Sequence, residues 1–194
     1  MTIPSILSVA RSGQSVFKTA DLALLWGIHD RDYLKNKICR LVKNGGLIRL
    51  KSGLFVWGKN YDPLLAANKI VSPSYVSLQT VLAPAGALFQ FDSAIYSIAQ
   101  ISTEKKIGSA RFVYRKIRDE ILFQKRGVLI KEGASVATPE RAFLDWLYLN
   151  PSISVDHPDV LDKQICLDLV PLYKNKALER RLKRCFKEKN MKRK

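Results

Sequence analysis

The chain has 194 residues, of which 47% are hydrophobic, so it can build one large domain or two small ones around buried cores and is not a mostly disordered protein. No apolar run approaches the roughly eighteen residues of a membrane helix, and the first residues lack the apolar centre of a secretion signal. The cysteines Cys39, Cys166 and Cys185 are odd in number and far apart, which argues against a disulfide framework. We therefore expect a cytoplasmic protein with no membrane partner.

The net charge of +16 is concentrated at the two ends of the chain. Residues 1–60 hold ten Lys and Arg against three Asp and Glu, and residues 174–194 hold eleven against two, whereas residues 61–173 hold twelve of each. Such basic ends indicate a polyanionic partner, either nucleic acid or an anionic membrane. The alternative is that the charge only keeps the protein soluble.

Residues 1–60 predict three helices followed by a hairpin. A short helix over 3–11 precedes a second helix within the segment FKTADLALLWG, residues 17–27, which Thr19 caps and Gly27 ends. Asp30 caps a third helix, and its apolar residues recur at helical spacing until Asn44-Gly45-Gly46 stops it. Residues 47–57 then read as two short strands around Lys51-Ser52-Gly53. This order is typical of a winged helix-turn-helix.

The third helix carries cations and an amide on the faces that its apolar stripe leaves free. We expect Arg31, Lys35 and Asn36 near base edges, with Lys37 and Arg40 nearer the backbone. Tyr33 either donates to a phosphate or packs on the first helix. The candidate DNA contacts, including the wing, are Arg31, Tyr33, Lys35, Asn36, Lys37, Arg40, Lys43, Arg49 and Lys51. Two alternatives remain: a solvated basic face, or a winged helix used only for protein contacts.

Residues 61–194 predict a second, α+β domain with a small antiparallel sheet and C-terminal helices. We expect a helix over 63–70 and a helix over 74–88 that is broken near Pro84 and Gly86. Short segments with strand character follow at 94–102, 110–117, 121–124, 127–132 and 135–137. Thr138 then caps a helix that ends at Asn150-Pro151. The whole chain is thus expected to be α+β.

The ordered segments GLIRLKSGLFVW, AANKIVSPSYVSLQTVLAPAGAL and ATPERAFLDWLYLNP resemble the AbiEi-type antitoxins of type IV toxin–antitoxin systems, over residues 15–150. The resemblance implies that the N-terminal domain binds operator DNA of its own promoter and represses it. It further implies that the C-terminal domain acts as an antitoxin against a nucleotidyltransferase-like toxin. The chain departs from the family in its short, very basic C-terminal end. The family offers no catalytic residues to transfer.

The residues themselves give no indication of an enzyme, a metal or another cofactor. His29 and His157 fall in predicted loops without metal-ligand spacing to a cysteine, and no phosphate-binding glycine loop occurs. We expect Asp145 to hydrogen-bond a neighbouring segment, and Cys39 to be a small packing residue. The rival classes are an RNA-binding accessory protein and a protein-interaction module whose charge is incidental.

Residues 175–189 predict a basic amphipathic helix with an apolar stripe of Leu178, Leu182, Cys185 and Phe186. Three interpretations compete. The stripe docks on the second domain and leaves the cations for DNA phosphates, or it binds a partner such as a toxin, or it lies on an anionic membrane.

Overall fold

The computed structural model describes residues 3–89, 92–150 and 155–192. Its N-terminal part contains three helices and a three-stranded antiparallel sheet of order β1-β3-β2. The elements are α1 (Ile3–Arg11), β1 (Val16–Lys18), α2 (Thr19–Trp26), α3 (Arg31–Lys43), β2 (Ile48–Lys51) and β3 (Leu54–Val56). The three helices and the hairpin lie where the sequence predicts them. Strand β1, which the sequence pattern did not predict, pairs with β3 and forms one edge of this small sheet.

The ends of α2 and α3 follow local capping chemistry. Gly27 ends α2 in the left-handed conformation with φ 62°, and the Asp30 carboxylate accepts a hydrogen bond from the Tyr33 N–H at 2.7 Å, so both predictions are confirmed. The predicted cap at Thr19 is wrong, because Thr19 is already the first helical residue. Lys18 occupies the cap position, and its N–H donates to the Asp21 carboxylate at 2.8 Å.

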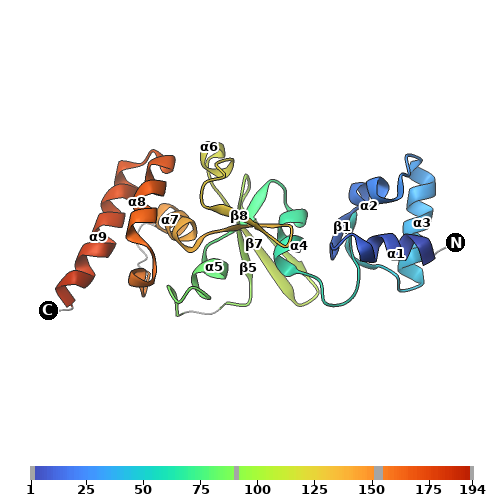
Figure 1. Ribbon diagram of the computed structural model, residues 1–194, viewed down its shortest axis with the longest axis horizontal. Coiled ribbons are helices and arrows are strands. Elements are labelled where there is room, and N and C mark those ends of the chain that lie inside the picture. The colour runs from blue at the N-terminus through green and yellow to red at the C-terminus, as the bar shows by residue number, and fades with distance from the viewer. Residues whose placement is uncertain (1–2, 90–91, 151–154, 193–194) are drawn as a thin grey trace.

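A six-stranded sheet of order β6-β7-β5-β4-β9-β8 forms the centre of the molecule (Figure 1). Its strands and the helices between them are α4 (Pro63–Ile70), β4 (Ser74–Val76), α5 (Gln79–Leu82), β5 (Ile95–Ala99), β6 (Thr103–Ile107), β7 (Ala110–Lys116), α6 (Asp119–Leu122), β8 (Val128–Lys131) and β9 (Ala134–Ala137). The expectation of an antiparallel sheet is wrong. Strands β4 and β9 are parallel, as are β5 and β7, so the sheet is mixed.

Two segments of the central part adopt a different structure from the predicted one. Residues 74–88 do not form one helix, because Val76 is a central-strand residue between Ser97 of β5 and Val136 of β9. Only Gln79–Leu82 is helical there. Residues 121–124 are not a strand. The backbone turns helically after Arg118, which places Ile121 in the core. The charged edge strand β6 was missed.

Three α-helices form the C-terminal end of the fold, opposite α1–α3 along the long axis (Figure 1). They are α7 (Pro139–Leu149), α8 (Lys163–Leu169) and α9 (Lys176–Lys192), with 3-10 turns at Pro158–Val160 and Val170–Tyr173. Thr138 caps α7 by accepting from the Arg141 N–H at 3.2 Å, as predicted. On α9, Leu178 and Leu182 are buried in the core that contains α7, so the predicted docking of its apolar stripe on the second part of the chain is confirmed. Contact of its cations with DNA phosphates stays a prediction.

A buried polar network joins α7 to its neighbours. The Asp145 carboxylate accepts hydrogen bonds from Tyr75 (3.0 Å), Ser77 (2.8 Å) and Tyr173 (2.6 Å), which confirms that it bonds to neighbouring segments. Burial raises the pKa of this carboxyl, while the nearby Arg141 and the hydroxyl donors act to lower it. Arg141 also donates to the Ile121 carbonyl at 2.8 Å. The network therefore ties β4, α6 and the turn before α9 to one helix.

The two sheets share a hydrophobic cluster on α4. Val16, Leu54 and Val56 of the small sheet are buried in one cluster with Leu65 and Ala66 of α4 and with residues of the large sheet. An ion pair between Asp21 of α2 and Lys69 of α4 lies beside it. The predicted boundary near residue 61 therefore falls between elements that pack against each other.

Candidate nucleic-acid interface

Helix α3 presents its basic side to solvent because its apolar residues occupy the opposite side. Leu34, Ile38 and Leu41 are buried in the N-terminal core with Phe17, Leu22 and Phe55. The remaining predicted contacts on this helix are exposed, apart from Lys37, which is half-buried: Arg31, Tyr33, Lys35, Asn36, Arg40 and Lys43. Four of these exposed residues are cations, so α3 offers a positively charged outer surface.

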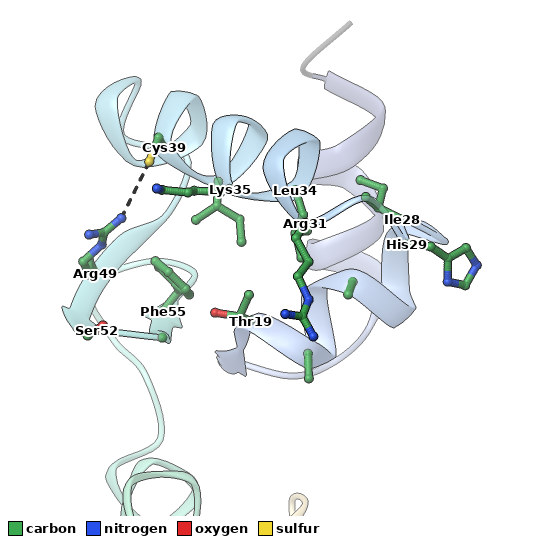
Figure 2. Close-up of a pocket in the computed structure, with 14 residues that line it drawn as sticks. Thr19, Ile28, His29, Arg31, Leu34, Lys35, Cys39, Arg49, Ser52 and Phe55 are labelled. Atoms are coloured by element: carbon green, nitrogen blue, oxygen red, sulfur yellow. Dashed lines mark hydrogen bonds between the residues drawn. The ribbon is translucent and has the colours of Figure 1, made fainter.

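A hollow of about 720 Å³ lies between the start of α2, the N-terminal half of α3 and the β2–β3 hairpin. Apolar side chains, including Leu34, Ile38 and Phe55, line part of it. Figure 2 shows Arg31 extending from α3 toward Thr19 at the start of α2, and Lys35 extending toward the side of Arg49. The hollow therefore combines apolar walls with guanidinium, ammonium and hydroxyl groups.

The two predicted contacts on the hairpin have different surroundings. The Arg49 guanidinium lies over the Phe55 ring at 5.4 Å and its Nη2 is 3.9 Å from the Cys39 sulfur, so it adjoins α3 (Figure 2). Lys51, in contrast, points its Nζ to the Ile70 carbonyl at the end of α4, 3.3 Å away. Arg49 therefore belongs to the same surface as α3, whereas Lys51 links the hairpin to the second part of the chain.

Lys37 faces α2 rather than the outer surface of α3. Its ammonium group lies 4.7 Å from the centroid of the Trp26 ring, and the Trp26 indole N–H bonds to Ser5 and Ser8 of α1. Partial burial lowers the pKa of Lys37, and the charge of Arg40 adds to this. The environment of Lys37 thus differs from that of the solvent-facing cations.

One exposed residue of α3, Asp32, went unrecognised in the sequence, and the role predicted for a second, Cys39, was wrong. Asp32 lies one helical turn before Asn36, which lies two turns before Lys43, so the three share one face. The four-residue spacing between Asp32 and Asn36 could have indicated this shared face from the sequence. Cys39 was expected to be a small packing residue, but its side chain is exposed and lines the hollow. The apolar stripe passes through Ile38, and the adjacent position falls outside it.

The described residues contain neither a candidate metal-ligating cluster nor a candidate membrane-spanning helix. In residues 3–89, 92–150 and 155–192, no three His, Cys, Asp or Glu side chains come together as a candidate metal site. None of the helices described is long and apolar enough to cross a membrane. His29 lines the hollow, but Figure 2 shows its ring pointing away from the other labelled side chains.

The fold defines the chain as an α+β protein with a mixed six-stranded sheet and a second, three-stranded sheet. No protein-family model and no curated protein matches the sequence. Among solved structures, the chain is similar to the protein RV2827C from Mycobacterium tuberculosis, with a TM-score of 0.51 and 14% sequence identity. The similarity covers 91% of this chain and 73% of that one. This similarity concerns the fold, that is, the arrangement of the helices and strands.

Proposed function

We propose that residues 1–60 form a winged helix-turn-helix that binds duplex DNA through α3, and that the protein represses its own promoter. The observation that carries this proposal is the shared surface of α3 and the hairpin. Arg31, Lys35, Arg40 and Lys43 are exposed on one helix, and Arg49 joins them from β2. A recognition helix followed by a wing places such groups against a groove and its phosphates.

The hollow beside α3 suits the DNA backbone. Phosphate oxygens would pair with Lys35 and Arg49, whose cationic groups lie at the hollow. Because each neutralised phosphate releases counterions, binding should weaken steeply with salt, with a log–log slope near −0.9 for each contact.

We assign the recognition of base edges to three exposed residues of α3, Arg31, Asp32 and Asn36. Asn36 bonds in bidentate fashion to adenine, and Arg31 to guanine. Asp32 precedes Asn36 on the same face, where a carboxylate accepts from the cytosine amino group and repels phosphates. Together these three residues would supply sequence preference, and the cations around them would supply affinity.

The antitoxin role extends this proposal and is supported by the resemblance of residues 15–150 to AbiEi-type antitoxins. Its test is growth of cells that express a nucleotidyltransferase-like toxin of the kind that the resemblance implies, taken from the same operon. Rescue by the full chain supports the role. Unrelieved toxicity at matched expression of both proteins rejects it and leaves the DNA-binding role unaffected.

Fluorescence anisotropy of the full chain tests DNA binding. The probe is the duplex from just upstream of its own gene, at near-physiological salt, with a shuffled duplex as competitor. We expect Arg31→Ala and Asn36→Ala each to cost about 1–3 kcal/mol and to relax the preference for the probe. Lys163→Ala, which removes an exposed cation from α8, is the matched control and should bind like wild type.

Three outcomes distinguish the proposed function from its rivals. Wild-type affinity and preference in both α3 variants would reject α3 as the reading helix. Tighter binding to single-stranded RNA than to either duplex would favour the RNA-binding alternative. Absence of binding to any nucleic acid, at low as well as at near-physiological salt, would favour a protein-interaction module.

A further inference from the structure

The C-terminal helix α9 and Lys174, two residues before it, expose a second group of cations at the end of the molecule opposite α3 (Figure 1). Lys174, Lys176, Arg180 and Lys183 are exposed, and we call these four residues the C-terminal basic face. Three of them follow each other at spacings of four and three, which aligns them along one side of the helix. The segment 174–194 holds eleven Lys and Arg against two Glu.

The apolar side of α9 is already occupied inside the protein. Leu178 and Leu182 are fully buried, and Phe186 meets Phe143 of α7 edge to face with ring centroids 6.1 Å apart. Arg181 donates from its Nη1 to the Leu147 carbonyl at 2.8 Å. An amphipathic helix needs a free apolar face to insert into a membrane, so this surface is suited to an electrostatic partner.

A row of solvated cations without an apolar face fits a linear polyanion, and duplex DNA is the polyanion that the proposed function supplies. Figure 1 places α9 and α3 at opposite ends of the long axis. Residues 61–173 between them hold twelve cationic and twelve acidic residues. The central segment therefore has no net positive charge with which to bind a single duplex that runs from α3 to α9.

We propose that the C-terminal basic face binds the phosphates of a second DNA duplex without sequence preference, so that one chain bridges two duplex segments. The inference rests on the proposed binding of the first duplex by α3. Four phosphate contacts give a log–log salt slope of about −4, so the second contact is weak at high salt. Bridging raises the local concentration of the second duplex around an operator-bound chain.

A bead assay with the full chain tests this proposal. The upstream duplex is immobilised, the protein is added, and capture of a fluorescent, unrelated duplex is measured at low and moderate salt. The test variant replaces the four residues of the C-terminal basic face with Gln. The control variant replaces four exposed lysines of the central and C-terminal parts with Gln, which removes the same charge: Lys105, Lys125, Lys131 and Lys163.

We expect wild type and the control variant to capture the fluorescent duplex, and the test variant to capture at least tenfold less. Equal capture by all three proteins overturns the proposal, as does an equal loss in both variants. Tighter binding of wild type to anionic phosphatidylglycerol vesicles than to the unrelated duplex also overturns it.

Operator affinity, measured by anisotropy for the same proteins, separates this inference from the proposed function. We expect the test variant to bind the upstream duplex within about threefold of wild type. A loss of operator affinity as large as the loss of capture means that the basic face contacts the first duplex, which overturns bridging alone. Absence of operator binding by wild type overturns the proposed function and bridging together.

Discussion

The guanidinium of Arg141 and the carboxylate of Asp145 lie one turn apart on α7, with both side chains fully buried and 3.6 Å between Nε and Oδ1. Arg141 also donates to the carbonyls of Arg126 (3.0 Å) and Ile121 (2.8 Å), whereas Asp145 accepts from three hydroxyl groups. The pair therefore fixes the segment from α6 to β8 against α7. Charges buried in this way are costly to separate because neither can return to water.

Arg141→Met should lower the free energy of unfolding by about 3–5 kcal/mol, because it leaves a buried carboxylate without its cation and two carbonyls without a donor. Denaturant unfolding of this variant, of Asp145→Asn and of the double variant measures the coupling. The double variant should be less destabilised than the sum of the two single variants. Lys163→Met is the exposed control and should change stability by less than about 0.5 kcal/mol. Strict additivity would contradict the coupling.

Lys51 and Arg49 should differ in DNA binding, although both lie on β2. Arg49→Ala should weaken binding and reduce the salt slope by about 1, since Arg49 adjoins α3. Lys51→Ala should leave affinity within about twofold, because its ammonium group is engaged by the Ile70 carbonyl. Salt titrations of both variants by anisotropy provide the comparison. A larger effect of Lys51→Ala would place the hairpin turn, rather than Arg49, on the DNA.

Gly127→Ala should be much more destabilising than Gly108→Ala. Both glycines have positive φ, +74° and +60°, so each substitution introduces backbone strain of about 1 kcal/mol. Only at Gly127 would the new Cβ also meet the Arg141 Cβ, at 2.9 Å, and Leu169, at 3.2 Å. Thermal denaturation should therefore show a further loss of about 1–3 kcal/mol for Gly127→Ala. Equal destabilisation by the two substitutions would mean that α7 and α8 move apart at this contact without a cost in stability.

Asp92 should contribute to stability in a pH-dependent way. Its pKa is lowered to about 2, chiefly by the hydrogen bond from Tyr96 (2.6 Å), with the Ala94 N–H and Arg111 adding to it. A carboxyl with a lowered folded-state pKa stabilises the protein above its unfolded pKa, near 4, and loses that contribution as the pH falls through about 2.

The variant Asp92→Asn should therefore have a lower Tm than wild type at pH 5 to 7, by at most about 3 °C, because the group is partly exposed. The difference should shrink between pH 4 and pH 2. Calorimetry at several pH values measures it, with the exposed Glu120→Gln as control. A difference that stays constant down to pH 2 would contradict the assignment.

The sequence predicted the ends of those helices that capping residues close by in the chain determine. Asp30, Gly27 and Thr138 act within a few residues along the chain, so the caps and stops of α2, α3 and α7 were legible. The exposed side of α3 was predictable for the same reason, because its apolar residues recur at helical spacing.

Errors arose where distant pairing decides the structure. Val76 is extended because it lies between β5 and β9, and no local pattern indicates these partners. The parallel pairing of β5 with β7 likewise depends on the crossover between them. Within the candidate interface, Lys51 was assigned by its position on the hairpin, but its contact with Ile70 is set by packing against α4.

The cluster shared by both sheets makes α4 the structural link between the N-terminal three helices and the rest of the chain. Val16 and Val56 are fully buried against apolar residues that follow position 61. A fragment cut near residue 60 would expose these side chains on both pieces, so neither piece retains its full core. The chain should therefore unfold in a single cooperative transition, and DNA bound at α3 should raise the melting temperature of the distant C-terminal helices as well.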